Sequence, residues 1–222
     1  MKTFAIDTST NSATAAIVED GNVIGCFTVC MNKPHSQKIM PVAEMLFKQT
    51  ELMPKDIDLF AAAEGPGSFT GLRIGIAAGL GLSDAVEKPC VGVSTLRSLN
   101  FPYEKYNKYV CPLIDAKRDR AYFALYKGRK TIIEPDSKPI TEILSILDRY
   151  DESVLLTGDF VQSHEDLLNA YNSGKYIIEE RSKCISDAVN VAVLAERIYR
   201  RGDYGRITPK YVLKSYVEEL PK

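Results

Sequence analysis

Four glycines stand at intervals of four residues in the middle of the chain: Gly67, Gly71, Gly75 and Gly79. A helix has 3.6 residues per turn, so this spacing places all four along one helical face. A glycine inside a helix costs up to about 1 kcal/mol relative to alanine, and such a row is explained only where another backbone comes close. Two explanations stay open: the helix packs tightly on its own sheet, or, as we expect, it forms a subunit interface.

Gly67, Gly71 and Gly75 belong to the run EGPGSFTGLRIG at residues 64–75, and Gly79 lies four residues beyond it. The run follows an apolar segment at residues 58–63. The run lacks the Gly-Lys-Ser/Thr of a phosphate-binding P-loop and the GxGxxG spacing of a dinucleotide-binding turn. The pattern predicts a short buried strand, a glycine-rich turn and a helix at residues 70–86.

A second helix is predicted at residues 36–50, with Ser36 available as its N-cap. Its apolar side chains cover more than half of the helical circumference, although a surface helix needs only one apolar face. Either this helix is buried within its own lobe, or, as we expect, a neighbouring subunit covers its second face. The predicted partner interface combines both helices and comprises Ile39, Met40, Ala43, Phe47, Gly67, Gly71, Arg73, Gly75, Ala78 and Gly79.

Three hydroxyl residues follow Asp7 at the end of a predicted first strand: Thr8, Ser9 and Thr10. In actin-like and sugar-kinase-like ATPases a loop of this layout faces phosphate, and the carboxylate holds a hydrated metal ion. These four residues are our candidates for a vestigial nucleotide-binding site, because Ser9 stands where a phosphate-gripping loop usually has glycine. The alternative is that Asp7 and the hydroxyls only satisfy backbone groups of the turn.

The composition changes at residues 101–108, a polar and aromatic segment without apolar periodicity, which we interpret as a linker. It divides the chain into lobes at residues 1–100 and 101–222. Like the first, the second lobe opens with predicted strands, at residues 109–115 and 121–127, and both opening hairpins carry an Asp in the turn region. We therefore predict two related α/β lobes, with the last helix and the tail as candidates to return to the first lobe.

Charge and cysteine content narrow the class of protein. The formal net charge is -1, from 28 Lys and Arg against 29 Asp and Glu, whereas a protein that grips RNA by itself usually has a basic surplus. The five cysteines form no CxxC pair and only two histidines are present, so we expect free thiols and no metal site. We interpret His35 as a surface or capping residue and residues 115–120 as a solvated turn rather than as catalytic groups.

Nothing at the start of the sequence resembles a signal peptide. The longest apolar stretch, residues 72–86, contains Arg73, Ser83 and Asp84 and is too short to span a bilayer. We expect a soluble cytoplasmic protein that has no membrane partner.

The glycine run at residues 64–75 is the most specific of a set of motifs that covers nearly the whole chain. The others are AIDTST at residues 5–10, HS at 35–36, GVSTL at 92–96, DAKR at 115–118, TGD at 157–159 and PKY at 209–211. Together these motifs resemble the TsaB/YeaZ family, with the second half matching more loosely than the first.

The resemblance implies an actin-like (ASKHA) fold of two ribonuclease-H-like lobes and a catalytic paralogue, TsaD, as the partner. In that family TsaD transfers a threonylcarbamoyl group to the tRNA adenosine next to the anticodon, and the ATPase TsaE assists. The TsaB subunit is a scaffold that needs no cofactor and has no catalytic activity of its own. Two helices of its first lobe, here residues 36–50 and 70–86, pack against TsaD or, in the absence of TsaD, form a homodimer.

Two departures bear on the implied role. TsaD carries a paired-histidine metal motif on its equivalent of the first helix, whereas this chain has only His35 there, so the resemblance implies no transfer chemistry. The tail continues Tyr211 with VLK, where the family commonly has Leu-Arg, so a role for that arginine does not carry over.

Three other functions compete with the scaffold role. The main alternative is an active actin-like ATPase or small-molecule kinase that uses Asp7 and the three hydroxyls. A peptidase with Ser36 or Ser68 as nucleophile lacks an identifiable supporting carboxylate. A two-metal nuclease requires several converging carboxylates, and only Asp7 is well placed.

Overall fold

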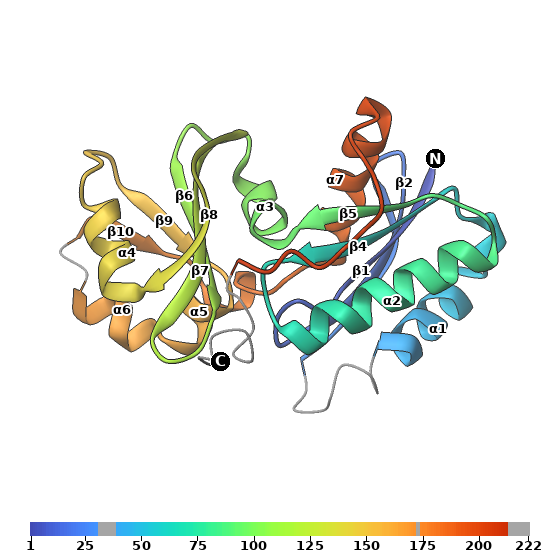
Figure 1. The fold of residues 1–222 in the computed structure, drawn as a ribbon, viewed down its shortest axis with the longest axis horizontal. Helices are drawn as coiled ribbons and strands as arrows, with labels where there is room; N and C mark the ends of the chain where they lie inside the picture. Colours follow the sequence, from blue (N-terminus) through green and yellow to red (C-terminus); the bar gives the residue numbers. More distant parts are fainter. Residues whose placement is uncertain (31–38, 172–173, 213–222) are drawn as a thin grey trace, which may run out of the picture.

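The computed structural model describes residues 1–30, 39–171 and 174–212 and contains two five-stranded sheets (Figure 1). The first sheet has the order β3-β2-β1-β4-β5. Strands β1 and β2 are antiparallel, as are β2 and β3, while β4 and β5 run parallel to β1. The five strands are β1 (Lys2–Asp7), β2 (Ala13–Glu19), β3 (Asn22–Val29), β4 (Leu59–Gly65) and β5 (Cys90–Ser94).

The second sheet repeats this topology. Its order is β10-β9-β6-β7-β8. Strands β6, β7 and β8 pair antiparallel in chain order, and β9 and β10 run parallel to β6 on its other side. The strands are β6 (Tyr109–Asp115), β7 (Arg120–Lys127), β8 (Lys130–Pro139), β9 (Val154–Thr157) and β10 (Tyr176–Ile178). The repeat confirms the prediction of two α/β lobes, although strands β8 and β10 were not among the predicted elements.

Helices cover both faces of the first sheet. Helices α1 (Ile39–Thr50) and α2 (Phe69–Ala85) lie side by side on one face, and α7 (Ala188–Arg201) covers the other (Figure 1). Successive side chains of a strand point to opposite faces, so Phe4 and Ile6 pack toward α1 and α2 while Ala5 packs toward α7. Helix α7, the last helix of the described residues, therefore belongs to the core of the first lobe.

The second sheet is also covered on both faces. One face packs against α4 (Ile140–Leu147), α5 (Asp159–Ser163) and α6 (Glu165–Tyr171). The other face receives α3 (Thr95–Asn100), which follows β5 directly and buries Leu96 and Leu99 against the second lobe. Helix α3 thus leads the chain from one lobe to the other. Short 3-10 turns occur at η2 (Pro54–Asp56), η3 (Phe101–Tyr103) and η4 (Arg181–Lys183).

The described part of the tail crosses back over the first lobe. Ile207 is buried beside Ala62 and Ile76. The backbone N–H of Lys210 donates to the carbonyl of Glu64 at 2.7 Å, and the Lys210 ammonium pairs with the Glu64 carboxylate at 2.7 Å. Residues 203–211 form neither helix nor strand, and Val212 lies in a bend.

Some predictions fall outside the described residues. These are the helix start at Ser36, the placement of His35, and the tail beyond Val212. The described start of α1 is Ile39, and α2 begins at Phe69 after Ser68, whose hydroxyl accepts from the Gly71 N–H at 3.2 Å.

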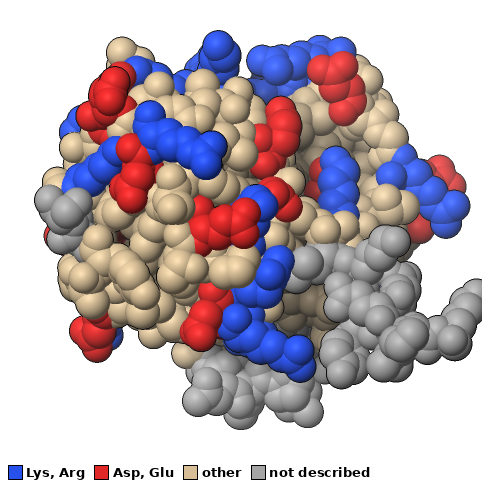
Figure 2. Space-filling view, turned by 60° about the vertical axis from the view of Figure 1, so that its left-hand side comes forward, with Lys and Arg blue, Asp and Glu red and all other residues tan. Residues whose placement is uncertain are grey.

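The cysteines and the surface charges agree with what the composition predicts. All five cysteines are free, and basic and acidic side chains are interspersed over the face shown in Figure 2. Within the described residues, no helix has the length and apolar content that crossing a bilayer requires. In that part of the chain no group of three or more His, Cys, Asp or Glu side chains could hold a metal ion.

Candidate functional site

The glycine row of α2 lies against the loop that follows β1. A Cβ atom added at Gly71 would stand 2.0 Å from the Thr8 carbonyl oxygen, and one added at Gly75 would stand 2.3 Å from the Thr8 hydroxyl. At Gly67 the added atom would stand 2.3 Å from the Ser9 carbonyl oxygen. The backbone that comes close to this row therefore belongs to the chain itself.

Five residues of the predicted partner interface are buried inside the first lobe. Gly71, Gly75 and Gly79 are buried on the inner face of α2, and Ile39 and Ala43 are buried in the core beneath α1. A small-residue stripe has the same spacing whether its close neighbour is an internal loop or another subunit, and here the internal loop fills it.

The other predicted interface residues keep some exposure. Met40 is 47% exposed and Arg73 is also exposed, whereas Gly67 and Ala78 are partly buried and Phe47 stacks on Phe4 with ring centroids 5.0 Å apart.

The outer faces of α1 and α2 form one surface. On α1, Met40 and Met45 are each 47% exposed. On α2 the exposed side is a stripe of spacing three and four, made of Thr70, Arg73, Ala77, Gly81 and Asp84. We call these seven residues the outer helix face. No described segment of the chain packs across it, apart from the tail near the start of α2, where the Tyr211 hydroxyl accepts from Arg73 Nε at 2.9 Å.

The carboxylate of Asp7 is enclosed by the first lobe. Asp7 is 0% exposed, and its Oδ1 accepts from the Ser9 N–H at 2.8 Å and the Ser9 hydroxyl at 2.5 Å. Its Oδ2 has no hydrogen-bond partner among the described residues. Burial raises the pKa of Asp7, and the two hydrogen bonds from Ser9 oppose that shift. Asp7 is therefore closed to a ligand in the solvent.

The hydroxyls that follow Asp7 are also used inside the fold. Thr8 donates to the Gly71 carbonyl at 2.7 Å, and Thr10 donates to the Ser186 hydroxyl at 3.1 Å. The Ser9 carbonyl accepts from the Ser68 N–H at 2.7 Å, which joins this loop to the glycine-rich turn. The bond from the Ser9 N–H to Asp7 satisfies a backbone group of the turn itself. The Thr8 and Thr10 hydroxyls instead bond to α2 and to Ser186.

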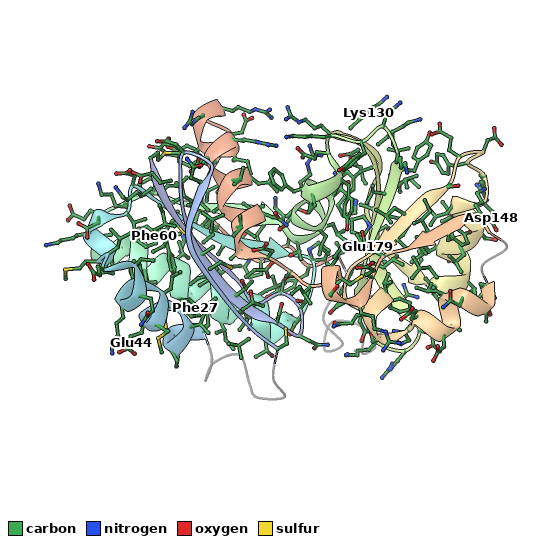
Figure 3. All side chains as sticks on the ribbon, turned by 180° about the vertical axis from the view of Figure 1, so that it is seen from behind. Phe27, Glu44, Phe60, Lys130, Asp148 and Glu179 are labelled. Atoms are coloured by element: carbon green, nitrogen blue, oxygen red, sulfur yellow. The ribbon has the colours of Figure 1, made fainter. Side chains whose placement is uncertain are left out.

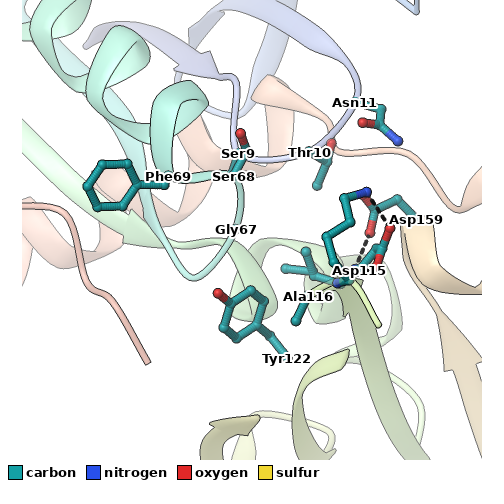
Figure 4. A pocket seen from close by; sticks show the side chains of 12 residues that line it. Ser9, Thr10, Asn11, Gly67, Ser68, Phe69, Asp115, Ala116, Tyr122 and Asp159 are labelled. Carbon is teal, nitrogen blue, oxygen red and sulfur yellow. Dashed lines mark hydrogen bonds and ion pairs between the residues drawn. The ribbon is translucent and has the colours of Figure 1, made fainter. Parts of the chain in front are cut away.

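A cleft of about 270 Å³ nevertheless separates the two lobes at this point (Figure 4). Ser9, Thr10 and Asn11 line it with the turn at residues 67–69. The facing wall comes from the second lobe and consists of Ile114, Asp115, Ala116, Lys117, Tyr122 and Asp159. Two of the four predicted nucleotide-binding residues, Ser9 and Thr10, thus reach the cleft, and Asp7 and Thr8 do not.

All charged side chains of the described residues that line the cleft belong to the second lobe: Asp115, Lys117 and Asp159. Lys117 pairs with Asp115 at 2.6 Å, and the Asp115 N–H donates to Asp159 Oδ1 at 3.0 Å. Burial raises the pKa of Asp159 to about 6, although the hydrogen bond from the Asp115 backbone opposes that shift. Three consecutive residues, 117–119, have positive φ angles of 65°, 54° and 56°, a conformation that is costly for non-glycine residues and often found at functional sites.

The cleft does not fit the nucleotide and metal that an actin-like fold accommodates. The first-lobe carboxylate is buried, and the Ser68 amide that could donate to a phosphate donates to Ser9 instead. The wall opposite holds two carboxylates, Asp115 and Asp159, and one lysine, Lys117, whose ammonium pairs with Asp115. Sequence reasoning treated residues 115–120 as a solvated turn and did not select Asp159. One sequence feature points to Asp115 as a cleft residue: Asp7 and Asp115 each end the first strand of a lobe.

Known sequences that this chain resembles carry names that concern the threonylcarbamoyl modification of tRNA adenosine. Residues 25–149, more than half of the chain, match the family model described as "TsaD: tRNA N6-adenosine threonylcarbamoyltransferase". A Bacillus subtilis protein named "tRNA threonylcarbamoyladenosine biosynthesis protein TsaB" is 29% identical over 172 residues, which are 76% of this chain and 75% of that protein. The Escherichia coli protein of the same name is 36% identical over 129 residues, which are 57% of this chain and 55% of that protein.

Solved structures share the fold. A crystal structure from Pseudomonas aeruginosa, described as an uncharacterized protein with similarity to peptidase YEAZ, has a TM-score of 0.79 and 21% identity and covers 96% of this chain and 99% of its own. YeaZ from Pseudomonas aeruginosa has a TM-score of 0.77 and 22% identity over 95% of this chain and 99% of its own. With its repeated lobes and actin-like α/β fold, this chain belongs to the TsaB/YeaZ family.

Proposed function

We propose that this chain is a non-catalytic cytoplasmic subunit that binds and supports a TsaD-type transferase. The complex would install threonylcarbamoyl on the tRNA adenosine next to the anticodon. The names of the relatives support the process, and the surface of the first lobe supports the role of a binding subunit. TsaE and tRNA would associate with the complex through TsaD.

The observation that carries the proposal is the outer helix face. Met40 and Met45 of α1 add two half-exposed, adaptable apolar side chains of the kind that partners use, with the exposed Glu44 and Lys48 on the same helix. The neighbouring helix adds a stripe with small residues at Ala77 and Gly81, where a Cβ added to Gly81 would meet nothing within 4 Å. A paralogue with two similar helices fits this surface, and a second copy of the chain would occupy it when the paralogue is absent.

The first loop supports a role without catalysis. Because Asp7 is buried and the Thr8 and Thr10 hydroxyls bond within the fold, the loop has no free carboxylate for a metal ion. The alternative, an ATPase or small-molecule kinase, requires Asp7 to open toward the cleft.

The pairing experiment uses the TsaD protein of the same organism and size-exclusion chromatography with light scattering. We expect Met40→Glu and Ala77→Arg each to weaken pairing at least 100-fold, because each places a charge on the interface. Ile177→Glu is the matched control, because Ile177 is 43% exposed on β10 of the other lobe. Thermal melting checks that all three variants keep the fold.

Loss of pairing in the two helix variants but not in the control would support the proposal. Equal pairing in all four proteins would show that the outer helix face is not the interface with TsaD. If the unchanged chain does not pair with TsaD, the proposed function is wrong. Calorimetry with Mg-ATP tests the alternative: micromolar binding that disappears in Asp7→Ala would favour the ATPase or kinase.

A further inference from the structure

A second hollow between the lobes, of about 350 Å³, lies next to α7 rather than next to α1 and α2. Four arginines line it and come from three separate elements. Arg97 lies on α3, Arg129 on the turn between β7 and β8, and Arg197 and Arg201 lie one turn apart on α7. We call this hollow the arginine pocket.

Both lobes contribute to the pocket. Figure 3 shows nitrogen-tipped side chains of α7 and of the β7–β8 hairpin, whose turn is marked by Lys130, reaching toward one another across the gap. The outer helix face lies beyond the first sheet, on the side opposite α7 (Figure 1). A ligand in the arginine pocket would therefore not compete with a partner on the outer helix face.

One buried carboxylate holds three of these arginines in place. The side chain of Glu104 is 3% exposed and lies 2.7 Å from Arg197 Nη1, 3.3 Å from Arg129 Nε and 3.7 Å from Arg97 Nε. A single carboxylate can neutralise only one guanidinium. The cluster therefore does more than balance Glu104, although its ion pairs also tie the hairpin of the second lobe to α7 of the first.

Further contacts orient the guanidinium groups. The Arg197 guanidinium lies 4.8 Å from the centre of the Phe101 ring, and that of Arg97 lies 5.5 Å from the centre of the Tyr126 ring. Arg97 Nη1 also donates to the Thr131 hydroxyl at 3.4 Å. Guanidinium groups that are fixed before binding lose little freedom when a ligand arrives.

The pocket keeps a positive surplus. Three acidic residues line it: Glu104, Glu64, which is paired with Lys210 at 2.7 Å, and Glu134, which is exposed. Among the described residues no carboxylate lies within ion-pair distance of Arg201. With Glu64 neutralised by Lys210, four arginines face two carboxylates, so a surplus of about two positive charges remains in a partly enclosed space.

We propose that the arginine pocket binds a phosphate-bearing anion. Arginine presents several N–H donors in a planar fork that matches phosphate oxygens, and each pair is charge-assisted. A phosphate group carries close to two negative charges at neutral pH, which equals the surplus. Phosphate esters occur in free nucleotides and in the RNA backbone, and the pocket recognises the chemistry that these sources share.

Calorimetry with inorganic pyrophosphate tests the pocket at low ionic strength. We expect Arg129→Gln and Arg201→Gln each to lower the affinity about tenfold, because neither variant removes the closest partner of Glu104. The matched controls are Lys130→Gln, at the first residue of β8 next to Arg129, and Arg200→Gln, from the same turn of α7. Both lose the same charge outside the pocket, so we expect changes below twofold.

Failure of pyrophosphate to bind the unchanged protein at millimolar concentration would overturn the proposal. Equal losses in the pocket variants and in their controls would overturn it too, since binding would then depend only on net charge. Competition separates the sources: displacement of pyrophosphate by a mononucleotide assigns the pocket to free phosphate esters, and displacement only by an RNA stem-loop assigns it to the RNA backbone. Thermal melting verifies that the four variants are folded.

Discussion

The two lobes share a strand order but use the equivalent aspartate differently. Asp7 ends β1 and is fully buried, with Ser9 as its partner, whereas Asp115 ends β6, lines the cleft and pairs with Lys117. A carboxylate at the end of the first strand is therefore not enough to make a ligand site. The packing of the loop that follows decides whether the carboxylate can be reached.

The helix after the fourth strand of each lobe explains the difference. In the first lobe this helix is α2, with 17 residues, and its glycine row draws the Thr8–Ser9 loop against it. In the second lobe it is α5, with only 5 residues. Gly158, just before α5, approaches the Leu113 carbonyl, but no row of glycines follows it. The loop after β6 consequently stays open toward the cleft.

The largest effect should come from filling the contact that closes the first loop. We expect Gly71→Ala to destabilise the fold by about 3 kcal/mol or more, because its Cβ would stand 2.0 Å from a backbone oxygen that has no rotamer to change. Urea unfolding measures the free energy.

Gly81→Ala on the same helix is the matched control for that change. Nothing lies within 4 Å of its added Cβ, so the higher helix propensity of alanine should stabilise the protein by up to about 1 kcal/mol. Equal effects of the two substitutions would show that α2 does not press on the first loop and would remove the explanation for the closed Asp7.

The next effect concerns the buried carboxyl of the second lobe. Burial raises the pKa of Asp159 to about 6 from its ordinary value of 3.8, so the folded state binds this proton more tightly than the unfolded state does. The contribution to stability is therefore greatest below pH 4 and falls as the pH rises to 6. For a shift of about two units, the loss at pH 7 amounts to about 2 to 3 kcal/mol.

Asp159→Asn removes that titration while its side-chain oxygen can still accept from the Asp115 N–H. We expect the variant to be about 2 kcal/mol more stable at pH 7 and to lose most of the decline between pH 4 and 6. Chemical unfolding at a series of pH values measures both. A variant with the same pH dependence as the unchanged protein would indicate that Asp159 is not enclosed.

The sequence predicted the framework better than the contacts across it. The hairpins and the two helices on one face of the first sheet follow from local periodicity, which each segment carries by itself. Contact between Thr8 and Gly71 joins residues far apart in the chain, and a glycine every four residues looks the same for an internal and an external neighbour. The sequence did not single out Glu104 within the polar segment at residues 101–108 for the same reason, since two of its arginine partners, Arg129 and Arg197, lie far from it in the chain.

The smallest effects compare the two strand-end aspartates directly, by removing the side-chain partner of each. Ser9→Ala leaves the buried Asp7 carboxyl without its 2.5 Å hydroxyl bond, so we expect a loss of about 1.5 to 2 kcal/mol. Lys117→Met removes a pair whose lysine side chain is 76% exposed, and such pairs contribute about 0.5 kcal/mol or less. Urea unfolding of both variants at pH 7 gives the two values. If the lysine variant lost as much stability as the serine variant, the second-lobe loop would be as tightly built into the fold as the first, and the difference in access between Asp7 and Asp115 would need another cause.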